Sequence, residues 1–285
     1  MKLRKTQGAI LCPGCKALID ADEPACPHCG LRAPGLFGFG HIMSALFSGR
    51  KDLVAGLLIT CTALFVATLV LDWQHVRMFG GFISMLNPSS ASLYTFGMTG
   101  GQAYRMGHWW TLTTATFLHG GLVHLAFNMM WLRVLGPTVM VEMGPARFIV
   151  AFVVTGITGA LAGNLYGLVM YGVPYPSIGA SGAVFGLMGV LITFGRRRGG
   201  AWGRALQGKL AAWALIAFVF GFAMPNVNNA AHFGGAAGGL LLGYFMPRFD
   251  RANEGLGVQL FAVALLAGSA VAMLASIVLM YPLQF

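Results

Sequence analysis

After its first fifty or so residues, the chain alternates long apolar runs with short polar or basic connections. The apolar runs cover about residues 53–73, 115–141, 148–171, 181–194, 210–224, 230–246 and 258–281. A helix of about 20 apolar residues crosses the hydrocarbon core of a bilayer, which is roughly 30 Å thick. The pattern therefore predicts an all-α polytopic membrane protein with seven spans and no globular domain after the first of them.

Composition and charge agree with this topology. Hydrophobic residues make up 57% of the chain and charged residues 9%, and the mean hydropathy is +0.73. With the N-terminus in the cytoplasm, all 18 Lys and Arg residues fall on the inner side except Arg77 and Arg105. This distribution predicts a cytoplasmic N-terminus and an outer C-terminus, and it explains the net charge of +10 without nucleic acid. No transit-peptide pattern is present, which favours a bacterial inner (plasma) membrane.

Four cysteines near the N-terminus are spaced as two knuckles. Cys12 and Cys15 form the first, and Cys26 and Cys29 form the second, with ten residues between the two pairs. Two such knuckles bring four thiolates to one ion, so the spacing predicts a zinc-ribbon-like module over residues 1–34 with a structural zinc. Iron or redox chemistry is the alternative, and disulfides are disfavoured in the cytoplasm. The module is expected to contact a cytoplasmic partner, a regulator or the membrane-proximal loops.

Two of the apolar runs begin with a serine and a histidine at matching depth. Ser181 lies 15 residues before Arg196, the expected inner end of its helix. His232 lies 16 residues before Arg248, the expected inner end of another. At about 1.5 Å per residue, both side chains lie roughly 22 to 24 Å from the inner face. Polar side chains at membrane depth are rare and usually functional, so the pair is predicted to act as nucleophile and base.

A third run carries His124 and Asn128, four residues apart and therefore on one face of a helix. Counted from Glu142, Asn128 lies 14 residues up the helix, roughly 21 Å from the inner face, in the layer of the serine and histidine. Amide hydrolysis by serine needs hydrogen-bond donors for the oxyanion of the tetrahedral intermediate. The predicted donors are His124, Asn128 and the backbone N–H of Ser181. His119 is expected either to support the site or to lie at the interface.

Small residues are expected to let the two catalytic helices approach each other. Gly182 follows the serine, and Gly235 and Gly239 follow the histidine at a four-residue spacing. Of the eight acidic residues, only Asp72 is expected near the outer face. The site is therefore predicted to be a Ser–His dyad without a carboxylate.

These residues resemble the pattern of the rhomboid family of intramembrane serine proteases. The resemblance lies in the GxSG around Ser181, the glycine-rich stretch after His232 and the HxxxN that begins at His124. It implies a six-helix catalytic core over residues 53–249, with a water-filled cavity open to the outer side. It also implies cleavage of transmembrane protein substrates near the outer ends of their helices. A linker over 35–52 and a seventh helix over 250–285 complete the expected layout.

The same resemblance assigns supporting roles to Gly179, Gly182, Phe185 and Gly235. Phe185 stands where the family often has a tyrosine beside the catalytic histidine, so ring stacking is expected without the hydroxyl. Trp110-Thr111 stands where many members have Trp-Arg, a departure that affects loop anchoring more than catalysis.

Two other functions fit the residues less well. A catalytically inactive rhomboid-like protein would bind transmembrane clients, which the presence of both Ser181 and His232 disfavours. A metal or proton transporter would use His119, His124 and His232, and the lack of an intramembrane carboxylate disfavours it. Catalysis itself is expected to need no cofactor.

Overall fold

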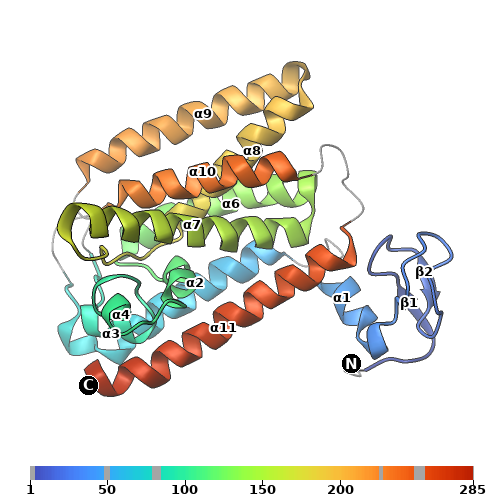
Figure 1. The fold of residues 1–285 in the computed structure, drawn as a ribbon, viewed down its shortest axis with the longest axis horizontal. Helices are drawn as coiled ribbons and strands as arrows, with labels where there is room; N and C mark the ends of the chain where they lie inside the picture. Colours follow the sequence, from blue (N-terminus) through green and yellow to red (C-terminus); the bar gives the residue numbers. More distant parts are fainter. Residues whose placement is uncertain (1–3, 48–51, 79–84, 225–226, 247–253, 285) are drawn as a thin grey trace.

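Long helices lie side by side in the structure, with a small module at one end of the bundle (Figure 1). The computed structural model describes residues 4–47, 52–78, 85–224, 227–246 and 254–284. Within these ranges the long helices are α2 (Leu53–Leu71), α6 (Leu122–Met143), α7 (Pro145–Tyr171), α8 (Ser181–Arg198), α9 (Gly200–Ala223), α10 (Asn229–Phe245) and α11 (Leu256–Gln284). Each corresponds to one predicted apolar run, which confirms the all-α membrane fold. The predicted boundary at 249/250 lies outside the described residues.

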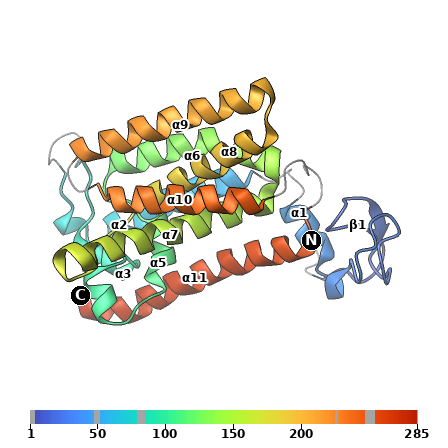
Figure 2. The ribbon, with the colours of Figure 1, turned by 45° about the horizontal axis from the view of Figure 1, so that its top comes forward.

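The helices differ in how apolar and how buried they are. By length and composition, α2, α7, α9 and α11 each suffice to cross a membrane. The less apolar α8 has residues 182–191 all buried, because it contacts protein on every side in that stretch. α9 packs against α8 and lies at the edge of the bundle (Figure 2).

Two spans begin at residues other than those predicted. The run from residue 115 follows the short helix α5 (Thr111–Thr114) and starts with the 3-10 turn Ala115–Phe117. α6 itself begins only at Leu122. The apolar count misses this break because the turns are buried although they do not continue the helix. The run from residue 210 belongs to α9, which begins ten residues earlier at Gly200. Its first turns carry Arg204 and Lys209, long side chains that can be helical while their charges reach water.

The helices α7, α8 and α10 approach backbone to backbone. A Cβ atom added to Gly235 on α10 would overlap the carbonyl oxygen of Gly182 on α8, and one added to Gly239 would overlap that of Gly186. On α7, a Cβ added to Gly159 would lie 2.9 Å from the carbonyl oxygen of Ala231. The predicted role of the small residues in helix approach is thereby confirmed.

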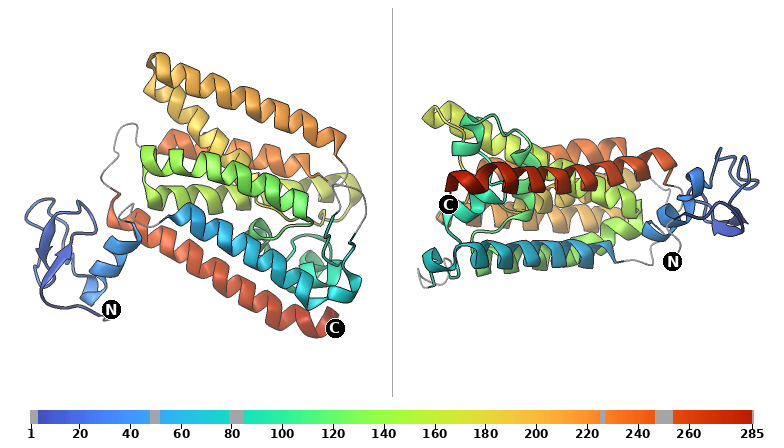
Figure 3. Two further views of the ribbon diagram at one scale, coloured as in Figure 1. Left: turned by 180° about the vertical axis from the view of Figure 1, so that it is seen from behind. Right: turned by 90° about the horizontal axis from the view of Figure 1, so that it is seen from below.

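The N-terminal module is built on a two-stranded antiparallel sheet. Strand β1 (Ala9–Leu11) pairs with β2 (Leu18–Asp20). A 3-10 turn (Leu36–Gly38) and the short helix α1 (Gly40–Leu46) lead from the sheet toward α2. The module has its own small core and lies beyond the end of the bundle where α11 begins (Figure 3). We call this end of the bundle the module end, and the opposite end the far end.

A hydrogen bond joins the module to α11, close to the start of α7. The side-chain amide of Gln259 on α11 donates to the carbonyl of Pro13 in the first knuckle, at 2.7 Å. Next to it, the buried carboxylate of Glu254 accepts from the backbone N–H groups of Ala146 (3.0 Å) and Arg147 (2.7 Å). Burial raises the pKa of the Glu254 carboxyl, while these two donors at the start of α7 lower it. The module, the start of α7 and the start of α11 therefore lie next to one another at the module end.

The substitution Gly239→Ala is expected to destabilise the protein by about 1–3 kcal/mol, because the added methyl group meets the Gly186 carbonyl rather than a flexible side chain. Thermal unfolding in detergent measures the effect. The matched control is Gly268→Ala on α11, where nothing lies within 4 Å of the added atom. Equal melting temperatures for the two variants would contradict the close approach of α8 and α10.

Candidate active site

Ser181 and His232 meet across the α8–α10 contact. Ser181 is the first residue of α8, and His232 lies in the first turn of α10. The Ser181 Oγ lies 3.0 Å from Nε2 of His232, a hydrogen-bonding distance. The glycine contact just below them allows this distance, because a Cβ atom at Gly235 would overlap the carbonyl oxygen of Gly182 and force the two helices apart.

The His232 ring is held on its other side by a residue that the sequence analysis missed. Oδ1 of Asn229 lies 3.1 Å from Nδ1 of His232. An amide oxygen only accepts, so Nδ1 carries the hydrogen and Nε2 is free to accept the Ser181 proton. The ring of Phe185 stacks on the imidazole at 4.5 Å between centroids and 15° between planes. The available signal was an asparagine three residues before the histidine, on the same helical face.

His124 lies on the opposite side of the serine. The backbone N–H of Gly120 donates to Nδ1 of His124 at 3.4 Å, so in the neutral ring Nε2 carries the hydrogen. A Cβ atom added to Gly179 would lie 2.7 Å from Nε2 of His124 and 3.8 Å from Oγ of Ser181. The ring and the hydroxyl thus flank one point beside Gly179. That glycine has a φ of +123°, a conformation that L side chains rarely adopt.

Asn128 and His119 pack around His124. Asn128 is buried, and one hydrogen of its amide bonds to the carbonyl of His124 at 2.9 Å. His119 is fully buried rather than interfacial, and its ring meets that of His124 edge-on at 5.2 Å. His119 therefore contacts the His124 ring, whereas Asn128 bonds the backbone of His124.

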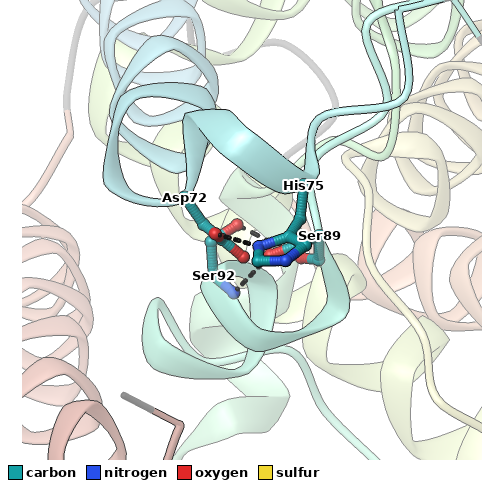
Figure 4. Close-up of polar contacts among 4 residues, drawn as sticks. All are labelled: Asp72, His75, Ser89 and Ser92. Atoms are coloured by element: carbon teal, nitrogen blue, oxygen red, sulfur yellow. Dashed lines mark hydrogen bonds and ion pairs between the residues drawn. The ribbon is translucent and has the colours of Figure 1, made fainter.

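Asp72 makes its contacts at the far end of α2. Its carboxylate pairs with Nδ1 of His75 at 2.7 Å (Figure 4). Hydrogen bonds from Ser89 and His75 lower the pKa of the Asp72 carboxyl. Ser89 also accepts from the backbone N–H of Ser92 and so caps the short helix α3 (Ser90–Thr95). The contacts of Asp72 fasten α3 to α2, and Asn229 takes the place beside the histidine that a third carboxylate would have.

The four cysteines of the module come together as their spacing predicts. Their sulfur atoms all lie within 4.8 Å of one another, with Cys12–Cys29 and Cys15–Cys26 at 3.7 Å. Sulfur ligands in a tetrahedral zinc site are about 3.8 Å apart, whereas a disulfide needs about 2.05 Å. Burial raises the pKa of Cys26, but hydrogen bonds from the backbone N–H groups of His28 and Cys29 outweigh it and lower the pKa to about 7. The lowered pKa of Cys26 favours its thiolate form, which is the form that binds metals.

Comparison with known proteins gives one family. The family model for the Rhomboid domain matches residues 106–249, about half of the chain. The chain is 34% identical over 180 residues to Rhomboid protease GluP of Bacillus subtilis (strain 168), which covers 63% of this chain and 33% of that protein. It is 31% identical over 175 residues to RHOMBOID-like protein 4 of Arabidopsis thaliana, covering 60% of this chain and 43% of the relative.

A third relative is Rhomboid protease GlpG of Yersinia pseudotuberculosis serotype O:3 (strain YPIII), 31% identical over 153 residues. That match covers 53% of this chain and 51% of the relative. The chain therefore spans between a third and about half of the length of these relatives.

The substitution Asn229→Ala is expected to slow the labelling of Ser181 by a serine-directed fluorophosphonate about tenfold. It removes one hydrogen bond, of about 1.4 kcal/mol, that orients the His232 ring. Asp72→Asn, which removes the carboxylate charge at the far end of α2 without changing the side-chain size, should label at the wild-type rate. A wild-type rate for Asn229→Ala would mean that Phe185 alone orients the ring. A slow but folded Asp72→Asn would point to a carboxylate third member.

Proposed function

Since the chain belongs to the rhomboid family of intramembrane proteases, we propose that it is a serine endopeptidase that cleaves transmembrane proteins within the bilayer. The observation that carries the proposal is the 3.0 Å contact between Ser181 and His232 at the ends of two membrane helices. Its substrates are membrane-anchored proteins that reach the site through the lipid.

The proposed reaction uses the groups around Ser181 in two stages. The Ser181 hydroxyl attacks the scissile carbonyl while its proton passes to Nε2 of His232. His232 then gives this proton to the leaving amine as the peptide C–N bond breaks. In the second stage, water attacks the acyl-enzyme with His232 again as base, which releases the new carboxyl end and restores the serine.

Three donors are proposed for the oxyanion that forms in each stage. Nε2–H of His124 flanks the Ser181 hydroxyl, as the geometry at Gly179 supports. The backbone N–H of Ser181 is at the N-terminus of α8, where helix N–H groups have no intrahelical partner and the helix dipole favours negative charge. The third donor is the side-chain amide of Asn128, through the hydrogen that does not bond to the His124 carbonyl. Such preorganised donors are usually the largest single contribution to catalysis.

The position of the site predicts where substrates are cut. Ser181 and His232 begin their helices at the far end of the bundle, and backbone must leave its own helix before a serine can reach its carbonyl. With the module end in the cytoplasm, cleavage falls near the outer end of the substrate helix. The positive-inside pattern supports this orientation. The absence of a transit-peptide pattern supports a bacterial inner membrane.

For the cysteine module we propose a structural zinc held by Cys12, Cys15, Cys26 and Cys29. Four sulfur ligands leave no open position for water, so the ion folds the segment rather than taking part in the reaction. The module would be a cytoplasmic attachment to the six-helix core of residues 53–249, with residues 250–285 as an additional helix.

Ser181→Ala and His232→Ala are each expected to abolish cleavage of a transmembrane reporter by the purified protein, because nucleophile and base act as one unit. Asn128→Ala should leave a rate about 10² to 10³ lower, since the other two donors remain. Mass spectrometry of the products locates the cut. Full activity of a folded His232→Ala variant, or a cut in the cytoplasmic half of the substrate helix, would contradict the proposal. An inactive wild type that binds transmembrane helices would favour the client-binding alternative.

Metal analysis of the purified chain is expected to find one zinc, which Cys12→Ser should lose and Cys61→Ser should keep. Cys61 is a matched control because it is buried in α2, away from the cluster. Cys12→Ser should still be labelled at Ser181. A chain without zinc would contradict the metal assignment, and loss of labelling would contradict the separation of module and catalysis.

A further inference from the structure

The face that α11 turns toward the bundle carries two buried serines. Ser269 and Ser276 lie seven residues apart on this face, with Ala272 between them, whereas Val271 and Leu274 are exposed on the other side. A hydroxyl inside a membrane protein needs a hydrogen-bond partner, because the lipid offers none. Both serines find one outside their own helix.

Each serine makes the same pair of hydrogen bonds. The hydroxyl of Ser276 donates to the carbonyl four residues earlier in α11, at 2.9 Å, and its oxygen accepts from the indole N–H of Trp110 at 3.1 Å. The hydroxyl of Ser269 likewise donates within the helix at 2.7 Å. A hydroxyl has one hydrogen, so Ser269 must accept from Thr113, whose Oγ1 lies 3.0 Å away. Both serines thus accept hydrogen bonds from residues in or next to α5.

Both donor residues belong to the segment of residues 97–117, which we call the far-end segment. Trp110 also stacks on His108, at 4.5 Å between ring centroids. Gly97 passes between α5 and α11 so closely that an added Cβ would lie 2.8 Å from Oγ of Ser276. In addition, the side-chain amide of Gln284 at the end of α11 donates a hydrogen bond of 2.9 Å to the side-chain oxygen of Gln102 in α4 (Gly101–Arg105). α11 therefore holds the far-end segment along the last turns of its length.

The far-end segment in turn holds the loop that leads to the nucleophile. Thr99 and Ser177 exchange two backbone hydrogen bonds, of 3.3 and 3.0 Å. The N–H of Gly179 donates to the carbonyl of Ala115 at 2.9 Å. Gly179 is two residues before Ser181 and borders the point that the hydroxyl shares with His124. Hydrogen bonds, together with the short stretches of chain between them, thus connect α11 to Gly179, two residues before the proposed nucleophile.

We propose that Ser269 and Ser276 are positioning residues, which fix the far-end segment and, through it, the loop that sets the place of Ser181. This inference rests on the proposed role of Ser181 as nucleophile. It assigns the seventh helix, which lies outside the six-helix core, a part in the geometry of the reaction. Neither serine touches the reacting atoms, so each acts only through Trp110 or Thr113.

The test is a double-mutant cycle on Ser276 and Trp110, read out as the rate at which a small fluorophosphonate labels Ser181. Ser276→Ala removes the acceptor, and Trp110→Phe removes the donor while keeping an aromatic ring beside His108. Each is expected to slow labelling about threefold to tenfold, which is the effect expected from the loss of one hydrogen bond. The double variant should be no slower than the slower single one, because the two changes break the same bond. The kcat for a transmembrane reporter should fall by the same factor, with KM unchanged.

The control is Leu274→Ala. The Leu274 side chain is exposed on α11 two residues from Ser276, so this variant should be labelled at the wild-type rate. All rates are measured well below the melting temperature of each variant, so that a loss of stability alone leaves them unchanged. If Ser276→Ala does not fold, Trp110→Phe tests the same bond.

The outcomes separate this inference from the proposed function. A wild type that is not labelled, or labelling that persists in Ser181→Ala, overturns the proposed function. A wild type labelled at Ser181 together with wild-type rates in Ser276→Ala and Trp110→Phe overturns only the positioning role. Effects of the two changes that multiply would show that the residues act separately, which also overturns it.

Discussion

The geometry of the candidate site depends first on the backbone contact between α8 and α10. Gly235 and Gly239 place α10 directly on the carbonyl groups of Gly182 and Gly186, and Gly159 brings α7 against both helices. At this spacing the first residues of the two helices come within hydrogen-bonding distance. Glycine lowers helix propensity in water, but in a bilayer small residues supply the close packing that apolar burial cannot.

Neutral groups place the ring hydrogen on different nitrogen atoms of the two histidines beside the serine. The amide oxygen of Asn229 makes Nε2 of His232 an acceptor, while the backbone N–H of Gly120 makes Nε2 of His124 a donor. One imidazole is therefore suited to take a proton from Ser181 and the other to stabilise negative charge. No buried carboxylate is needed for either orientation, which avoids placing a charge at membrane depth.

α11 touches both ends of the molecule. At the module end Gln259 bonds the first cysteine knuckle, and at the far end Ser276 and Gln284 bond the segment that borders the nucleophile loop. Thr111 stands where the family resemblance leads one to expect an arginine, and it is buried with its hydroxyl bonded to the carbonyl of His108. α11 thus supplies side-chain contacts to the segment that contains Thr111.

The hydropathy pattern alone was enough to predict the helices and their approximate spans. Because bilayer thickness and helical rise convert residue counts into position, the same pattern predicts a shared depth for Ser181, His232 and Asn128. The sequence also predicts the four-cysteine cluster, since knuckle spacing is a local property. Only the tertiary structure decided that Asn229 orients His232, that α6 begins at Leu122 and that α11 binds the far-end segment. These depend on which faces meet across the bundle, and neither periodicity nor hydropathy along one chain encodes which helices become neighbours.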